Sequence, residues 1–243
     1  MILNITGNSG CNLTIIDSNL IRKMSGNKKY NSRLIVQMKK QMNFDSPILK
    51  KPRVVNFGYE GDLFFFDMEY INGKSFSQYC IENNFSEIEN IMNLLLPKQN
   101  QKSKNISEDL FSKCKTLDNF PLHVLQEVSW DVPDSECHGD FTFENIIIYR
   151  DEIYLIDFLD SFVNTSIIDE SKFMQDTYCG WSFRNTENIP LHKLLMMNEI
   201  LESKQKYILL LVHLYRILPY SNEKTKGWVK CQIKRVLEKI KNI

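Results

Sequence analysis

The chain has 243 residues, of which 43% are hydrophobic and 25% are charged. This length is enough for one large domain or two smaller lobes with a sizeable core, and the composition is that of an ordinary globular protein. The 30 basic and 30 acidic residues cancel to a formal net charge of +0, so no overall field draws the chain to nucleic acid or to an anionic membrane.

The cysteines and the apolar segments indicate in which compartment the protein is expected and whether it inserts into a membrane. The six cysteines are scattered without a CxxC pair, so a zinc site is not expected. No basic start followed by an apolar signal segment opens the chain, and the longest apolar run, residues 207–218, is too short to span a bilayer. We therefore expect a cytoplasmic protein with free thiols, no nucleic-acid partner and no membrane insertion, and the oligomeric state stays open.

The N-terminal part is expected to form a mixed sheet with one helix. Short strands separated by turn residues are predicted at residues 2–6, 12–16, 19–23, 53–57 and 63–70. Between Ser32 and Met42, apolar residues recur at helical spacing with lysines on the other face, which predicts a helix. Because the turn Asn72-Gly73-Lys74 ends this pattern, we place an N-terminal nucleotide-binding lobe at residues 1–71 and a second lobe at residues 72–243.

The rest of the chain is expected to be mostly helical. Helices are predicted at residues 76–83, 87–96, 107–114 and 121–128, and a polar surface loop at residues 97–105. Two short strands, at residues 146–148 and 153–156, are joined by a turn at residues 150–152. From residue 168 onward the pattern is helical again, with breaks at residues 189–190, 219 and 226–227.

The most informative segments are CHGDFTFEN at residues 137–145 and IDFLD at residues 156–160. They place the carboxylate of Asp140, the carboxamide of Asn145 and the carboxylate of Asp157 in a fixed order at the ends of two apolar strands. In a hairpin, Asn145 and Asp157 reach the same end and can share one metal, with Asp140 farther out on a loop. Phosphoryl transfer from a nucleotide needs this set: a carboxylate that orients and deprotonates a hydroxyl, and oxygen ligands for Mg²⁺ on the phosphates.

The pattern HGDxxxxN followed by IDFxD resembles the signature of the aminoglycoside phosphotransferase and choline kinase-like family, which has the protein-kinase-like fold. The resemblance implies an α+β, two-lobed architecture, with a small antiparallel-sheet lobe carrying one helix and a larger, mainly helical C-terminal lobe. It also implies that Asp140 is the catalytic base, that Asn145 and Asp157 bind Mg²⁺, that Asp160 supports them, and that ATP is the nucleotide.

The same resemblance points to a small-molecule hydroxyl as acceptor. The chain has HGD where protein kinases have HRD, Thr142 stands where Ser/Thr kinases usually carry a lysine, and no APE-like segment follows Asp157. The segments HGDxTFEN and LIDFLDS are further similar to bacterial phosphotransferases linked to surface-polysaccharide assembly, which makes a sugar or sugar-like acceptor the first expectation. The lysine-rich C-terminal helices disfavour a polycation and leave phosphorylated or nucleotide-linked acceptors open.

Lys23 is, by the resemblance, the strand lysine that pairs with the nucleotide phosphates. Strand alternation puts Ile21 and Lys23 on one face and Arg22 on the other. The loop at residues 7–10 lies where a phosphate-covering loop belongs, which makes Ser9 a candidate nucleotide contact. Because this loop lacks GxGxxG, a simple hairpin turn is nearly as good an interpretation.

The acid that kinases carry on the following helix is missing from this chain. Kinases pair the strand lysine with a helix Glu, but residues 32–42 contain no acidic residue. Gln37 and Gln41 are the plausible partners, and we favour Gln37, whose amide would position Lys23 without neutralising it.

Residues 64–73 resemble the strand and hinge between kinase lobes. Backbone groups near Glu69 and Ile71 would hydrogen-bond the adenine edge. A core strand that ends in a turn is the plain interpretation, and it is compatible with the hinge.

These expectations describe a MgATP-dependent phosphotransferase that acts on a hydroxyl of a small molecule. A nucleotide-binding pseudokinase that scaffolds partners, an atypical protein kinase and an antibiotic kinase stay open as alternatives. The intact Asp140, Asn145 and Asp157 argue against the pseudokinase, whereas the missing helix acid and the sparse glycine loop argue for it.

Overall fold

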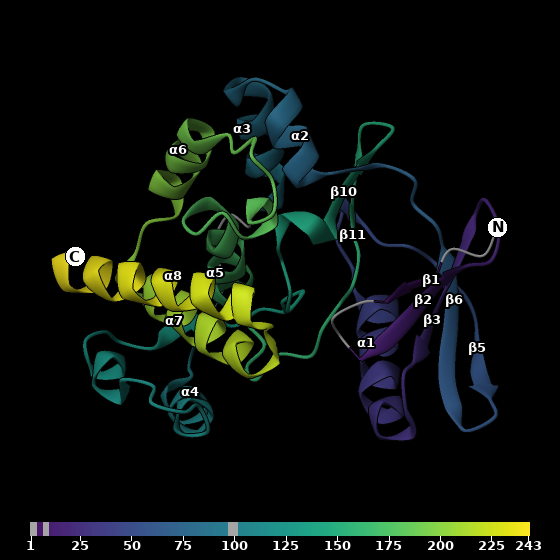
Figure 1. The fold of residues 1–243 in the computed structure, drawn as a ribbon, viewed down its shortest axis with the longest axis horizontal. Helices are drawn as coiled ribbons and strands as arrows, with labels where there is room; N and C mark the ends of the chain where they lie inside the picture. Colours follow the sequence, from purple (N-terminus) through teal and green to yellow (C-terminus); the bar gives the residue numbers. More distant parts are fainter. Residues whose placement is uncertain (1–3, 7–9, 97–101) are drawn as a thin grey trace. The chain divides into compact units, whose positions relative to one another are not determined.

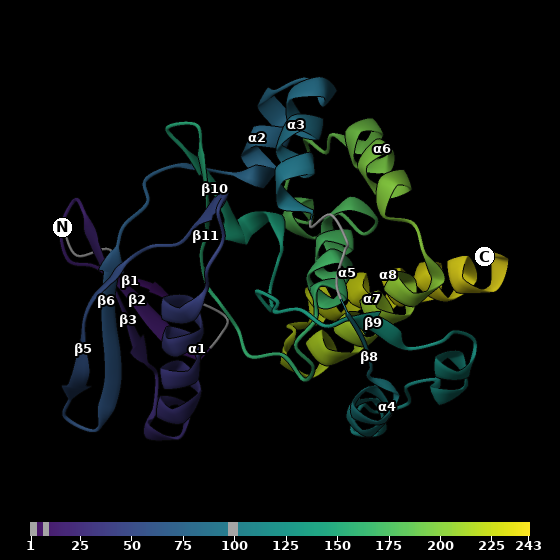
Figure 2. The same cartoon turned by 180° about the vertical axis from the view of Figure 1, so that it is seen from behind.

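The structure is a computed structural model that describes residues 4–6, 10–96 and 102–243 (Figures 1 and 2). The chain divides into two compact units, and each is described by itself. The first comprises Met1–Tyr79 with Glu144–Asp160, and the second comprises Cys80–Phe143 with Ser161–Ile243. The content is α+β, as predicted. The predicted lobe boundary after residue 71 stays a prediction.

The first unit is built on a five-stranded antiparallel sheet with the strand order β1-β2-β3-β6-β5. Its strands are β1 Asn4–Thr6, β2 Cys11–Ile15, β3 Leu20–Ser25, β5 Val54–Glu60 and β6 Leu63–Glu69. β3 pairs with β2 on one side and with β6 on the other, so Lys23 lies opposite both Leu13 and Phe66. Lys23 is therefore on an interior strand, where both neighbours restrict its position.

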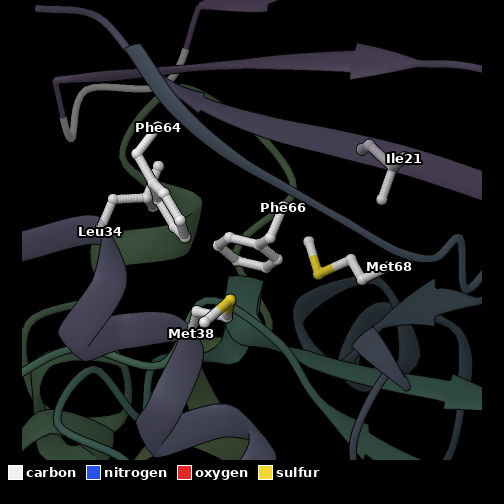
Figure 3. Packing of buried hydrophobic residues seen from close by; sticks show 6 residues of the cluster. All are labelled: Ile21, Leu34, Met38, Phe64, Phe66 and Met68. Carbon is white, nitrogen blue, oxygen red and sulfur yellow. The ribbon is translucent and has the colours of Figure 1, made fainter. Parts of the chain in front are cut away.

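Helix α1, Asn31–Asn43, covers one face of this sheet (Figure 1). Helical spacing places Leu34 and Met38 one turn apart, and strand alternation turns every second residue of β3 and β6 toward them. The cluster between helix and sheet consists of six buried side chains, which Figure 3 shows pointing into the space between α1 and the strands: Ile21, Leu34, Met38, Phe64, Phe66 and Met68. Burial of each such side chain contributes about 1.5–3 kcal/mol, so this cluster anchors α1 to the sheet.

A second sheet of the first unit contains the predicted hairpin, in the strand order β4-β11-β10-β7. Its strands are β4 Leu49–Lys50, β11 Glu152–Leu155, β10 Ile146–Tyr149 and β7 Lys74–Ser75. Arg150 and Asp151 have φ 51° and 61°, as a two-residue hairpin turn requires. Gly73 allows β7 to approach β10, because a Cβ at this position would lie 2.5 Å from the backbone oxygen of Ile148. The short strands β4 and β7 were not predicted.

The second unit is mostly helical. Its helices are α3 Phe85–Leu95, α4 Ser107–Lys115, α5 Ser166–Thr177, α6 Leu191–Leu201, α7 Lys204–Ile217 and α8 Glu223–Asn242, and α2 Phe76–Glu82 contains the boundary between the units. α7 is buried on all sides over residues 207–214, as a helix that is apolar all round should be. It packs against α5 and α8, and Figure 2 shows α7 beside α8. Along the described part of the chain, no helix has the length and apolar character needed to cross a bilayer.

Three expectations about the second unit were wrong. The predicted loop at residues 97–105 contains strand β8, Ser103–Asn105, which pairs with β9, Asp131–Pro133. The helix predicted at residues 121–128 is a short 3-10 turn, Leu122–Gln126. The break predicted at residues 226–227 is absent, because α8 continues through Gly227. A glycine inside a helix costs only about 1 kcal/mol, which the buried apolar face of α8 offsets.

Candidate functional site

Lys23 is the centre of the candidate site in the first unit. Only 3% of this residue is exposed. Its Nζ donates a hydrogen bond to Oε1 of Gln37 on α1 at 3.1 Å and forms an ion pair with Asp157. Arg22 points to the opposite face, where its Nε lies 2.7 Å from Oδ1 of Asp67. The predicted alternation along β3 is confirmed, and the predicted contact of Lys23 with Gln37 is present.

The charge of Lys23 is balanced by Asp157 and not by a residue of α1. A buried ammonium is costly unless it is paired. Burial lowers the pKa of Lys23, but the carboxylate of Asp157 raises it, and the net shift is upward. Nε2 of Gln37 donates to the hydroxyl of Tyr30 at 3.0 Å, which fixes the amide with its oxygen toward Lys23. Gln37 therefore orients the ammonium, and Asp157 neutralises it.

Asn145 and Asp157 lie at the same end of the hairpin. The N–H of Ile156 donates to the backbone oxygen of Asn145 at 3.0 Å, which extends the β10–β11 pairing by one position. Asp157 follows directly and has φ 59°, a left-handed conformation that aspartate tolerates better than most residues. The hairpin thus sets one carboxamide and one carboxylate at its open end, as the sequence predicted.

These two side chains fit a metal that is shared with a ligand. Among the residues that the structure describes, no group of three or more His, Cys, Asp and Glu could hold a metal ion. Mg²⁺ commonly uses one or two protein carboxylates and completes its shell with water and substrate phosphates. The donors of Asn145 and Asp157 therefore suit a Mg²⁺ held jointly with a nucleotide, and they do not suit a metal held by the protein alone.

The other nucleotide-binding candidates are only partly defined. Glu69 ends β6, and its N–H donates to the backbone oxygen of Arg53 at 3.0 Å. A ligand contact at Glu69 would therefore not use this N–H. Ile71 follows, half-buried, in an irregular segment before β7. Ser9 lies outside the described residues.

Asp140 belongs to the second unit, in the loop of residues 137–143, and α5 holds the start of this loop. The carboxylate of Asp169 accepts hydrogen bonds from the N–H of His138 at 2.5 Å and of Gly139 at 2.8 Å. Gly139 has φ 93°, which a residue with a side chain rarely adopts. Nδ1 of His138 accepts from the N–H of Asp140 at 3.3 Å. This buried histidine is therefore hydrogen-bonded within the loop.

Asp176 holds the other end of the 137–143 loop. Its buried carboxylate accepts from the N–H of Phe143 at 2.8 Å and from the N–H of Ser182 at 2.7 Å. The ring of Phe143 packs on that of Phe173, with centroids 4.8 Å apart. The end of the loop is thus fixed to α5 by both hydrogen bonds and aromatic packing.

Lys172 of α5 contacts Asp140 itself. Its Nζ lies 3.0 Å from Oδ1 of Asp140 and donates to Oε1 of Gln175 at 3.3 Å. Asp169, Lys172 and Asp176 are spaced three and four residues apart, so one face of α5 meets the loop at three places. Sequence reasoning missed Lys172. The signal in the sequence was the spacing of the polar residues Asp169, Lys172 and Asp176 in a helix that also carries the buried Phe173.

The predicted site residues therefore fall into two groups. Lys23, Gln37, Asn145 and Asp157 lie in the first unit, and Asp140 lies in the second. The structure brings the buried lysine, its amide and the hairpin aspartate together. The convergence of Asp140 with Asn145 and Asp157 stays a prediction.

Asp176→Ala is expected to lower the free energy of unfolding by about 2–5 kcal/mol, because two N–H groups lose their acceptor at a buried position. Urea denaturation of the wild type and the variant measures this loss. Asp134→Ala, which removes an exposed carboxylate paired with Lys104 in the same unit, is the matched control and should cost less than about 1 kcal/mol. Equal losses in the two variants would show that Asp176 is not a structural anchor.

Comparison with known proteins rests on structure. No family model matches this sequence, and no curated protein sequence matches it. A thermostable mutant of the aminoglycoside phosphotransferase APH(4)-Ia superposes with a TM-score of 0.65 at 10% identity, covering 98% of this chain and 94% of that chain. Choline kinase LicA from Streptococcus pneumoniae gives 0.56 at 14% identity, covering 100% and 94%. The gentamicin complex of APH(2")-IIa gives 0.54 at 13% identity, covering 100% and 91%. The predicted protein-kinase-like fold is confirmed.

Proposed function

We propose that this chain is a MgATP-dependent phosphotransferase that phosphorylates a hydroxyl of a small molecule. The observation that carries the proposal is the buried Lys23, held by Gln37 and paired with Asp157 at the end of the hairpin. A fixed cation beside a carboxylate that can ligate a metal is the arrangement that nucleotide phosphates require. The fold supports the proposal, because one structural neighbour is a ternary complex of APH(4)-Ia with AMP-PNP and hygromycin B.

Each residue has a defined part in the proposed reaction. Asp140 orients the acceptor hydroxyl and takes its proton while the new O–P bond forms and the bond from the γ-phosphorus to ADP breaks. Lys23 binds the α- and β-phosphates, and Asn145 and Asp157 supply the protein ligands for Mg²⁺. When bound there, Mg²⁺ neutralises charge on the phosphates. Glu69 and Ile71 border the adenine, and Ser9, outside the described residues, stays a candidate from the sequence alone.

For the acceptor we propose a sugar or sugar-like molecule. The contact of Lys172 with Asp140 means that this carboxylate is already paired with a cation. A polycationic acceptor would need unpaired acidic groups at this position, whereas the hydroxyl of a neutral sugar needs only a hydrogen-bond acceptor. We also propose that the protein acts in the cytoplasm, where ATP is at hand.

A nucleotide-binding pseudokinase is the second candidate, and one observation favours it. α1 has no acidic residue, so Lys23 takes its charge partner from Asp157, the proposed metal ligand. If this ion pair persists when nucleotide is bound, the metal site is weakened and the protein binds nucleotide without turnover.

Thermal unfolding with and without Mg²⁺ and ATP tests the nucleotide site. At a ligand concentration of about 100 times Kd, binding adds about 2.7 kcal/mol to the free energy of unfolding, which corresponds to a rise in Tm of roughly 5–10 °C for a chain of this size. The wild type should show this rise, and Asp157→Ala should lose the part that depends on Mg²⁺. Asp62→Ala, an exposed aspartate in the same unit, should behave as wild type. No rise in any protein would refute the nucleotide site.

Turnover on a panel of acceptors tests the reaction. The panel contains neutral sugars, aminoglycosides, choline and a generic protein, with ADP release as the readout. Transfer to a sugar supports the proposed acceptor, and transfer only to an aminoglycoside or a protein replaces it. Mg²⁺-dependent ATP binding with no turnover on the whole panel would favour the pseudokinase.

A further inference from the structure

Lys172 occupies a place that no signature motif of this sequence assigns. Its ammonium lies 3.0 Å from Oδ1 of Asp140, and 12% of the Lys172 side chain and 23% of the Asp140 side chain is exposed. We propose that Lys172 is the positioning residue of Asp140, which holds the carboxylate in one orientation and in its ionised form. This inference rests on the proposed function of Asp140 as the base.

The position of the ammonium is itself fixed. Lys172 extends from α5, and Oε1 of the buried Gln175, one turn further on, accepts a hydrogen bond from its Nζ at 3.3 Å. The backbone on the other side of the ion pair is fixed as well, because Asp169 binds the N–H groups of His138 and Gly139 just before Asp140. α5 thus carries one partner of the ion pair and holds the backbone next to the other, so it contributes to fixing the geometry of the pair.

A second titratable group close to Lys172, the imidazole of His213, adds no positive charge. Nε2 of His213 on α7 lies 3.0 Å from the hydroxyl of Ser171, the residue before Lys172. Burial, together with the charges of Lys172 and Arg216, holds the pKa of His213 well below its usual range, so this imidazole is neutral. The neighbouring Glu170 is paired with Lys206 at 2.6 Å.

The exposed fractions of the two side chains distinguish this ion pair from another pair on the same helix, which we take to be structural. In the pair of Glu170 with Lys206, the carboxylate is the more buried partner, at 7% against 16% exposed. In the pair of Asp140 with Lys172 the order is reversed, and the carboxylate is the outer partner. A carboxylate that is paired with a less exposed cation and still reaches solvent can meet an acceptor hydroxyl.

The chemistry of the proposed reaction is compatible with a paired base. A neighbouring ammonium favours the ionised form of a carboxyl group, so Asp140 would stay able to accept a hydrogen bond down to a lower pH. A loose transition state asks for positioning more than for a strong base. The weaker basicity of a paired carboxylate therefore slows the reaction little, and its fixed orientation favours the reaction.

Three variants test the proposal through the slow hydrolysis of MgATP, in which water is the acceptor. Lys172→Met removes the charge at similar length and is expected to lower kcat by about 10- to 100-fold with little change in KM for MgATP. The acid limb of its kcat profile should move to higher pH. Lys172→Arg keeps the charge and should keep the limb at its wild-type pH. Lys206→Met is the control: it should lower Tm and leave the limb in place.

A second readout does not depend on activity. In protein labelled with ¹³C at the aspartate carboxyls, the signal of Asp140 is assigned by its loss in Asp140→Asn, and its titration midpoint is compared between wild type and Lys172→Met. A higher midpoint in Lys172→Met supports the proposal. An unchanged midpoint, or an equal shift in Lys206→Met, overturns it. A wild type that does not bind MgATP would refute the proposed function, and the titration would still decide the role of Lys172.

Discussion

Asp140→Asn is expected to lower the rate of phosphoryl transfer by about 100- to 10,000-fold. The amide has the size of the carboxylate and still accepts a hydrogen bond from Lys172, but it cannot take the proton of the acceptor hydroxyl. The affinity for MgATP should change little, because Lys23, Asn145 and Asp157 are untouched. Initial rates at saturating acceptor, together with calorimetric titration with MgATP, separate the two quantities.

Asp134→Asn is the matched control for this variant. It makes the same chemical change at an exposed aspartate of the same unit, paired with Lys104 at 2.9 Å, and should leave the rate unchanged. If Asp140→Asn retained most of its turnover, the base would have to be another residue. If it lost nucleotide binding as well, the division of roles between Asp140 and the Lys23 group would be wrong.

Lys23→Met is expected to weaken MgATP binding by about 10- to 100-fold. A hydrogen bond to a charged group contributes about 1.5–3 kcal/mol, and each 1.4 kcal/mol is about a factor of ten in Kd. Methionine fills the space of the aliphatic stem, so the cluster between α1 and the sheet should remain packed. Fluorescence titration with a labelled ATP analogue and Mg²⁺ measures the affinity.

Arg22→Met provides the comparison on the same strand. Arg22 lies next to Lys23 but faces the other side of the sheet, where it pairs with the buried Asp67. Its replacement should lower stability, because the buried carboxylate of Asp67 loses its cation and keeps only the hydrogen bond from Asn56, and should not change the affinity for MgATP. Wild-type affinity in Lys23→Met would remove the nucleotide role of this lysine.

Local patterns predicted the parts of the site that lie close together in the sequence. The alternation of Ile21, Arg22 and Lys23 follows from the period of a strand. The shared hairpin end of Asn145 and Asp157 follows from two apolar runs joined by a short turn. Helical spacing places Gln37 and Gln41 on the same face of α1 and does not choose between them; Gln37 meets Lys23, whereas Gln41 donates to the backbone oxygen of Pro52.

The remaining contacts join residues that no local rule connects. Lys23 meets Asp157 across 134 positions, and β8 pairs with β9 across an intervening helix. Lys172 reaches Asp140 because α5 runs beneath the 137–143 loop, a packing choice that hydrophobic periodicity does not encode. In one sequence, a lysine inside a helix looks the same whether it meets water or a carboxylate.

The way α5 holds the 137–143 loop has a consequence for what sets the path of this loop. Asp169 and Asp176 bind main-chain N–H groups, and every residue except proline has one. These bonds do not depend on which side chains stand at positions 138 and 143. Only position 139 requires glycine, because its backbone has a positive φ. Apart from Gly139, the ring of Phe143 on Phe173 and the His138 bond to Asp140, the path of the loop therefore depends more on two aspartates of a neighbouring helix than on its own side chains.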